Sequence, residues 1–136
     1  MADLNVMAAN IKNILSTVPE IVEAFDYEPQ NINQLPAATL FFNGFTQTDQ
    51  TTRRFSVNWN WVIRLYIPIR VSDIKVPQVQ IRSLIESTIK QLRIDPTLGN
   101  ACLYHTVTAG EVFAMLDQNN PMLIAELELS ANTEEW

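Results

Sequence analysis

Apolar side chains occupy alternate positions in the middle of the chain, from about residue 56 to residue 67. Side chains two residues apart point to the same face of an extended strand, so this pattern predicts a strand with one apolar face. Its length of about twelve residues exceeds the roughly 3–10 residues usual for globular strands. The apolar face holds Val57, Trp59, Trp61, Ile63, Leu65 and Ile67, and the other face holds Ser56, Asn58, Asn60, Arg64 and Tyr66.

A shorter β-branched and aromatic segment, Thr39–Phe45, precedes this strand and predicts a second one. The polar segment Thr46–Arg54 contains no large apolar residue, so we expect it to be a mobile loop that joins the two strands into a hairpin. A hairpin this long is expected to project past the core of a small domain. Its far end then needs a partner.

Two segments repeat apolar residues at the three- and four-residue spacing of an amphipathic helix. The first is Leu4–Val18, and the second is Val76–Leu92 with Pro77 in its first turn. Pro19 either closes the first helix or opens a further helical turn, Glu20–Phe25. Two amphipathic helices of this kind need an apolar surface to cover, and the apolar face of the long strand supplies one.

The remaining segments predict a loop before the hairpin and three strands after the second helix. Asp26–Pro36 has no periodicity and predicts the loop. Ala101–Thr108 and Glu111–Leu116 predict short strands around a turn at Ala109-Gly110, and Asn119-Asn120-Pro121 predicts another turn. A last strand places Leu123, Ala125, Leu127 and Leu129 on one face, and Glu126, Glu128 and Ser130 on the other.

The order of these elements is α-β-β-α-β-β-β, without an internal repeat or a linker. Such an order predicts a single α+β domain over residues 1–136, with a mostly antiparallel sheet, a long β-hairpin and two helices packed on one face. The 136 residues and their 47% hydrophobic content are enough to form a core.

Charge and cysteine content narrow the possible partners. The net charge of −6 and the absence of any basic cluster beyond Arg53-Arg54 argue against a protein that binds nucleic acid or a membrane surface.

Cys102 is the only cysteine, so an intrachain disulfide is excluded. The chain begins without the basic start of a signal peptide, and no apolar run reaches the ~20 residues of a membrane helix, so a cytosolic compartment is expected.

Residue types that carry out catalysis are present but lack the partners that catalysis requires. Cys102 and His105 supply only two metal ligands, predicted on opposite faces of a strand, and a buried structural thiol is expected instead. Ser87 and Lys90 match the S-x-x-K pattern, but its companion motifs are missing.

The acidic residues and glycines give no catalytic or phosphate-binding motif either. Glu126 and Glu128 share a strand face and are interpreted as solvated. The three glycines are too far apart to form a phosphate-binding loop. We therefore expect no enzymatic activity, no cofactor and no metal.

Aromatic and basic residues near the hairpin are candidates for protein contacts. The tryptophan ladder is expected to face the core, while the Val57 end of the ladder, with Phe55, could lie in a subunit interface. Arg53 and Arg54 form a like-charged pair at the tip, which is expected either to dock on acidic groups of a neighbouring protein or to be solvated and keep the tip soluble. Trp136, the last residue, is a further interface candidate.

Two short segments and the order of elements indicate a family. Phe25-Asp26-Tyr27-Glu28-Pro29 follows the first helix, and Leu35-Pro36-Ala37-Ala38-Thr39 leads into the long aromatic hairpin. A helix and a closing strand rich in Leu and Glu complete the order. Over nearly its whole length the chain resembles the tail terminator (tail completion) proteins of long-tailed bacteriophages.

The resemblance implies a structural virion protein without catalytic or cofactor residues. Such proteins form a ring, typically a hexamer, on the head-proximal end of the tail tube. The ring stops tube polymerisation, contacts the neck proteins of the head, and lets the genome DNA pass through its hole without specific binding. The protein would be assembled in the host cytoplasm and reside at the tail–neck junction.

Two other functional classes remain open. The chain could be another neck component, such as a head-completion or adaptor protein, or a dimeric α+β domain that binds a small molecule. A binding domain should have a pocket with convergent polar groups, and none can be traced in the sequence. An enzyme is the weakest of the possibilities.

Overall fold

The computed structural model describes residues 2–51, 53–69, 75–116 and 120–135. Two helices and five strands make up this part of the chain. Their bounds are α1 Leu4–Ser16, β1 Glu23–Ala24, β2 Ala37–Asp49, β3 Phe55–Pro68, α2 Lys75–Ile94, β4 Tyr104–Met115 and β5 Met122–Glu135.

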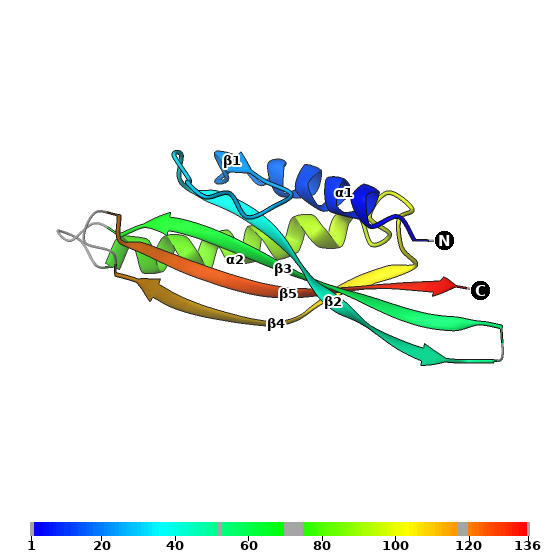
Figure 1. Cartoon of the computed structure of the whole chain (residues 1–136). Helices are drawn as coiled ribbons and strands as arrows, with labels where there is room; N and C mark the ends of the chain where they lie inside the picture. The colour runs from blue at the N-terminus through cyan, green and yellow to red at the C-terminus, as the bar shows by residue number, and fades with distance from the viewer. Residues whose placement is uncertain (1, 52, 70–74, 117–119, 136) are drawn as a thin grey trace.

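The five strands form one sheet in the order β1-β2-β3-β5-β4. Every neighbouring pair is antiparallel except β1 and β2, which are parallel. Both helices lie on the same face of the sheet, where α2 packs on β3 and β5 (Figure 1). The α+β fold with two helices on one face of a mostly antiparallel sheet is therefore confirmed.

The core lies between the helices and the central strands. The apolar face predicted for β3 is the one that faces the helices, and all its members are buried except Trp59, which is partly exposed. The helices contribute their own apolar stripes, and Asp3 caps α1 by accepting the backbone N–H groups of Asn5 and Val6. The fully buried apolar helix residues are Met7, Ile11 and Leu15 of α1 and Leu84 and Leu92 of α2, and Thr88 of α2 is also fully buried.

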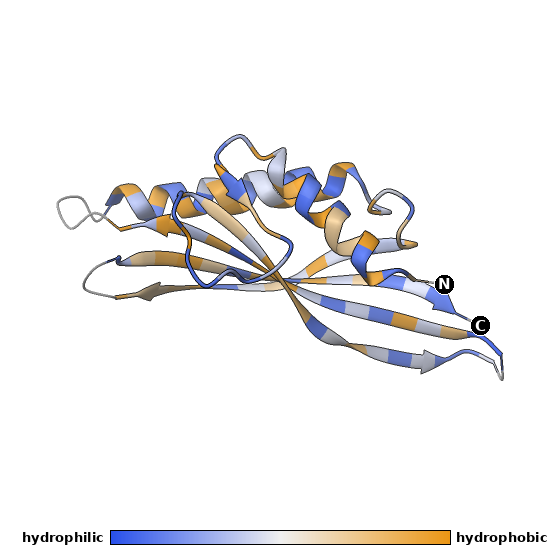
Figure 2. Cartoon of the chain, turned by 45° about the horizontal axis from the view of Figure 1, so that its top comes forward, coloured by the Kyte–Doolittle hydropathy of each residue, from blue (hydrophilic) through white to orange (hydrophobic). Residues whose placement is uncertain are grey.

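Three strands continue beyond the helices as a projecting arm (Figure 1). We define the arm as residues 45–49 of β2, 55–59 of β3 and 131–135 of β5, with the turn at residues 50–54 as its tip. The pairing of β3 with β5 extends to Phe55 and Glu135, so the predicted two-stranded hairpin has a third strand along its length. In Figure 2 the strands carry more hydrophilic residues in the arm than under the helices.

The segment after α2 differs from the sequence prediction. Two short strands around a turn at Ala109-Gly110 were expected, but β4 runs through these residues as one strand. A register shift between Val107 and Ala109 marks a bulge there instead of a turn. An extra residue in one strand bends it without ending it, because pairing with the neighbour resumes on the other side.

Two further boundaries also differ. Of the two alternatives for Pro19, a further helical turn at Glu20–Phe25 is wrong, because α1 ends at Ser16 and Glu23 and Ala24 form β1 beside Ala37 and Ala38. The loop predicted at Thr46–Arg54 is shorter, because β2 continues to Asp49 in register with β3. The segment continues β2 because its backbone pairs with that of β3. Its polar side chains are compatible with a strand here because this part of β2 is exposed to solvent.

Candidate protein-interaction site

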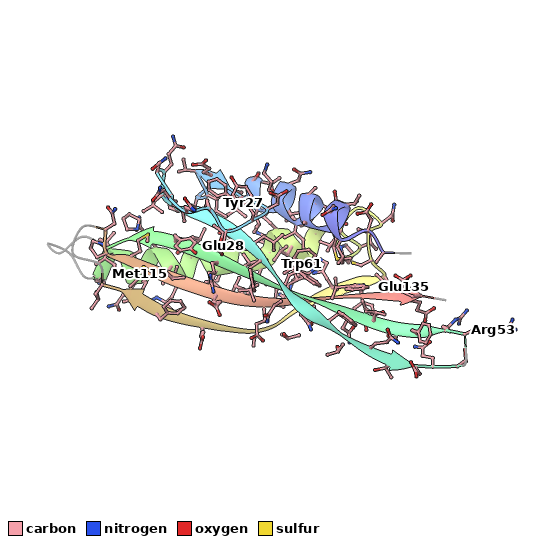
Figure 3. All side chains as sticks on the ribbon, viewed as in Figure 1. Tyr27, Glu28, Arg53, Trp61, Met115 and Glu135 are labelled. Carbon is pink, nitrogen blue, oxygen red and sulfur yellow. The ribbon has the colours of Figure 1, made fainter. Side chains whose placement is uncertain are left out.

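The tip of the arm holds the arginine pair predicted as an interface. The backbone N–H groups of Gln50 and Thr51 donate to the Arg54 carbonyl at 3.0 and 3.2 Å. The Thr51 hydroxyl accepts the N–H groups of Arg53 and Arg54 at 3.3 and 3.1 Å. Arg54 Nε lies 3.8 Å from Glu134 Oε2, whereas Arg53 extends past the end of the arm (Figure 3). The turn therefore presents positive charge at one extremity of the molecule.

Four aromatic rings follow one another on the helix side of the sheet, at the base of the arm. The centroid of Phe42 lies 5.0 Å from that of Trp61 and 6.5 Å from that of Trp59, and Phe45 lies 5.4 Å from Trp59. Phe45 is 57% exposed and Phe42 36% exposed, whereas Trp61 is buried. An apolar ring this exposed indicates a surface that can be covered by a partner.

The two tryptophans have different surroundings. Trp61 is buried, and its Nε1 lies 3.2 Å from Met7 Sδ in α1. Trp59 Nε1 donates to Thr133 Oγ1 at 2.9 Å within the arm. Trp61 therefore belongs to the core, as predicted, and Trp59 to the arm.

The structure describes Val57 and Phe55 but not Trp136 among the other predicted interface residues. Val57 is buried within the chain, so it offers no free surface. Phe55 is partly exposed at the start of β3. Trp136 lies outside the described residues. The structure thus brings Arg53, Arg54 and Phe55 together at the tip.

A groove opens on the helix side of the sheet between α2 and β4, and no pattern in the sequence predicted it. It has a volume of about 460 Å³ and is mainly apolar. Its walls include Ile85, Ile89, Val107, Val112 and Leu127, with Glu111 and the bulge residues also lining it. The groove exists because α2 packs on β3 and β5 and leaves the edge strand β4 largely uncovered.

Gly110 helps to keep this groove open. It pairs with Leu127, and a Cβ added at Gly110 would lie 3.0 Å from Leu127 Cδ2. A side chain there would crowd Leu127 and project over the groove floor. We attribute the glycine to this close approach, because its backbone has an ordinary negative φ.

Two carboxylates lie opposite each other on the helix-free face of the sheet, on the other side from the groove. Glu111 of β4 pairs in register with Glu126 of β5. Arg64 Nε donates to Glu126 Oε2 at 3.0 Å, so Glu126 is neutralised and its interpretation as a solvated residue is wrong. Glu111 is exposed, and among the described residues it has no cationic partner. Like charges directly opposite each other on a sheet repel, and the ion pair of Glu126 with Arg64 reduces this repulsion.

Glu28, from the segment before β2, crosses the helix-free face and binds three side chains. It accepts hydrogen bonds from the hydroxyls of Thr39 and of Tyr66, the latter at 3.1 Å, and its Oε1 lies 3.5 Å from Arg64 Nη1. Burial opposes the charge of Arg64, but the hydrogen bond to Glu126 and the nearby carboxylates raise its pKa. Burial and Glu28 raise the pKa of Tyr66. The network ties residues 25–35 to the sheet.

Cys102 and His105 do not form a joint site. Cys102 precedes β4 instead of lying on it, so the expectation that the two residues occupy opposite faces of one strand is wrong. The thiol is buried, as expected, and burial together with Asp95 raises its pKa to about 11. His105 Nε2 donates to the Asp95 carbonyl at 2.8 Å. A thiol with so high a pKa is a poor nucleophile at neutral pH.

The residues of the S-x-x-K pattern also have other surroundings. The Ser87 hydroxyl donates to Glu20 Oε1 at 3.2 Å, and Lys90 is exposed on α2. Within the described ranges, no three His, Cys, Asp or Glu side chains come together as metal ligands. No helix among the described residues combines the length and apolar character needed to cross a membrane.

Comparisons with known proteins add no family. No protein-family model matches the chain, and no curated protein matches it at a significant level. The functional proposal therefore rests on the arm, the groove and the charges described above.

Proposed function

We propose that this chain is a tail terminator: a structural protein that forms a ring, typically of six copies, on the head-proximal end of a phage tail tube. The ring stops tube polymerisation and joins the tail to the neck proteins of the head. Genome DNA passes through the central hole without specific binding. No catalytic step is part of this role, and no residue is assigned to one.

The arm is the observation that carries the proposal. It extends three paired strands to one end of the molecule, where residues 45–49 of β2 are exposed, although Val57 and Ala131 in the other two strands are buried. It ends in an arginine pair and exposes Phe45 at its base. An element that exposes aromatic and basic groups in this way is expected in a protein that binds its own copies.

The edges of the sheet support the same conclusion. β4 carries one charged residue, Glu111, and β2 carries one, Asp49, while neither strand contains Lys or Pro. Monomeric proteins commonly protect edge strands with such residues. β4 and the part of β2 beyond β1 nevertheless leave one backbone edge each that a neighbouring subunit can cover.

The function is tested in the phage that encodes the chain. We expect lysates that lack the protein to contain heads without tails and tails of abnormal length, as seen by electron microscopy. Supplying the intact protein from a plasmid should restore tails of uniform length, and this serves as the control. Tails of normal length joined to heads in the absence of the protein would contradict the proposal. Normal tails that fail only to join would indicate another neck component.

A further inference from the structure

Two strands of the sheet each have an open backbone edge. β4 is the last strand on one side, and the described residues place no strand beside its outer edge. On the other side, β1 pairs only with Ala37 and Ala38, which leaves the outer edge of β2 open in the arm. Such an edge presents a row of unpaired N–H and C=O groups, and a further strand is the structure that pairs them in a row.

Each edge is regular over one exposed stretch. A register shift ends just before Phe45 in β2, and residues 45–49 are then paired with β3 without interruption and are all exposed. Another shift ends just before Ala109 in β4, and residues 109–115 are likewise regular and exposed. Because a bulge bends a strand and disrupts its pairing, these two stretches are the parts of the edges best suited to accept another strand.

The two edges run in opposite directions. β2, β3, β5 and β4 lie side by side in this order, and each is antiparallel to the next, so β2 is antiparallel to β4. A second copy that is rotated about a ring axis without being turned over therefore brings its β2 beside β4 as an antiparallel neighbour, with the helices of both copies on one side. Figure 3 shows Arg53 at the arm tip and Met115 of β4 at opposite ends of the molecule, so one copy cannot make this contact within itself.

Side-chain alternation fixes how the two stretches fit together. The five residues of the β2 stretch fit within the seven of the β4 stretch in three antiparallel registers. Only the middle register keeps the helix-side side chains of both copies on one face, because a slip of one residue turns every side chain to the other face. That register places Thr48 opposite Glu111 and Phe45 opposite Ala114.

The charges agree with this register. Asp49 is the only charged residue of the β2 stretch and lies on the helix side, whereas Glu111 is the only one of the β4 stretch and lies on the helix-free side. The Thr48 hydroxyl can donate to the Glu111 carboxylate. Pairing of β4 with a second β4 would instead bring two copies of Glu111 onto one face, where like charges repel. The β2 edge is therefore the better partner for β4.

We propose that residues 109–115 of β4 pair in antiparallel fashion with residues 45–49 of β2 in a second copy of this chain, so that the sheets of neighbouring copies become continuous. The contact joins two different edges, so each copy keeps one of each for a further neighbour. Contacts of this head-to-tail kind close into rings when the rotation permits. The inference rests on the proposed ring and names the contact that joins its subunits.

Disulfide scanning between two chains tests which faces meet. One chain carries Thr48→Cys, a tagged second chain carries one cysteine in β4, and both carry Cys102→Ala to remove the native thiol. A disulfide needs Cα atoms within about 7 Å and Cβ atoms that point toward each other. Glu111→Cys should link to Thr48→Cys under mild oxidation. Val112→Cys is the matched control, because Val112 is an exposed neighbour on the opposite face, and it should not link.

Moving the first cysteine from Thr48 to Thr46 tests the direction of pairing. In an antiparallel pair, its partner should move two residues toward the end of β4, to Phe113→Cys. In a parallel pair, the partner would move to Ala109→Cys, and this result would overturn the proposal. Circular dichroism confirms that each single-cysteine variant folds.

Charge substitutions test the same register without a covalent bond. Thr48→Glu places a carboxylate opposite Glu111 and should raise the concentration needed for assembly by roughly threefold, whereas Thr48→Lys should lower it by a similar factor. The difference between the two variants should disappear in chains that also carry Glu111→Gln. A difference that persists unchanged in that background would contradict the predicted register.

Hydrogen exchange gives a readout that needs no substitution. Assembly should slow amide exchange at least tenfold in residues 45–49 and 109–115, at the alternate amides that point to the open edges. Residues 104–107 are the matched control, because they belong to β4 but lie outside the contact. Equal exchange in the monomer and the assembly at both stretches would overturn the contact.

The outcomes separate this inference from the proposed ring. Rings that form without the predicted disulfides overturn the contact and leave the ring intact. Linked chains that never close into a ring support the contact and contradict the ring. Chains with Glu111→Cys alone that link to each other would show that β4 pairs with β4, which overturns the contact. A chain that stays monomeric under all conditions overturns both.

Discussion

The same strands run through the helix-covered part of the sheet and through the arm, but their side chains have very different surroundings in the two regions. Ile63 and Leu65 of β3 are fully buried beneath the helices, whereas Phe45 on the same face of β2 is 57% exposed. Trp61 marks the boundary. Its Nε1 lies 3.2 Å from Met7 Sδ of α1, whereas Nε1 of Trp59, the next residue on this face toward the tip, donates to Thr133 in the arm. One pattern of alternating residues thus serves folding in one region and, in our proposal, assembly in the other.

Truncating the core should produce the largest loss of stability. Ile63→Ala removes a fully buried side chain and is expected to lower the free energy of unfolding by about 2–5 kcal/mol. Phe45→Ala removes a larger side chain from the arm but should cost only about 1 kcal/mol, chiefly the ring contact with Trp59. Urea denaturation of both variants measures the difference. Equal losses would mean that the arm is part of the folding core.

Removing Glu28 should cost less than removing the core residue but more than changing the arm tip. Glu28→Ala leaves the buried hydroxyls of Thr39 and Tyr66 without their acceptor, at about 1–3 kcal/mol. The exposed Asp26, two residues earlier, gives a matched control in Asp26→Ala. In a double-mutant cycle, Tyr66→Phe should cost less in the Glu28→Ala background than in the intact protein. Strict additivity of the two losses would argue against the network.

Reversing the arginine pair should separate assembly from folding. Arg53→Glu with Arg54→Glu is expected to change stability by less than ~0.5 kcal/mol, because both side chains lie at the exposed tip. The affinity of the arm tip for its proposed acidic partner, a neighbouring subunit or the tail tube, should fall more than tenfold, that is by more than ~1.4 kcal/mol. Thermal melting and a binding titration at physiological salt give the two numbers. Unchanged docking would place the interface elsewhere.

Shortening the tip should have the smallest effect on folding. The deletion must be confined to residues 50–54, because residues 46–49 belong to β2. We expect a melting temperature close to that of the intact protein, since the turn is exposed, together with impaired assembly. Leu84→Ala, at a fully buried position, sets the scale of a core change. A shift as large as that one would make the tip part of the fold.

The sequence predicted the elements whose pattern is local. The alternation in β3 and the stripes of both helices each identify a face without knowledge of the rest of the chain. β1 was missed because two residues cannot establish a period, and the parallel pairing with β2 depends on distant residues. The turn predicted at Ala109-Gly110 was wrong because a glycine in a strand also marks a bulge or a close approach, here to Leu127.

The candidate site was harder to predict than the fold. The tip arginines could be found because they are adjacent in sequence. The roles of Glu28 and Glu111 could not, since each depends on side chains that are brought near by the sheet. The groove is defined by where α2 stops covering the strands, which no single segment determines.

The central claim is that the arm serves assembly, and the mass of the purified protein in solution tests it most directly. Native mass spectrometry over a range of concentrations, alone and with tail tube, should show a closed ring of one stoichiometry for the intact chain. The variant with Arg53→Glu and Arg54→Glu should remain folded and shift to the monomer mass. Monomer alone for the intact chain, with and without tube, would contradict the account.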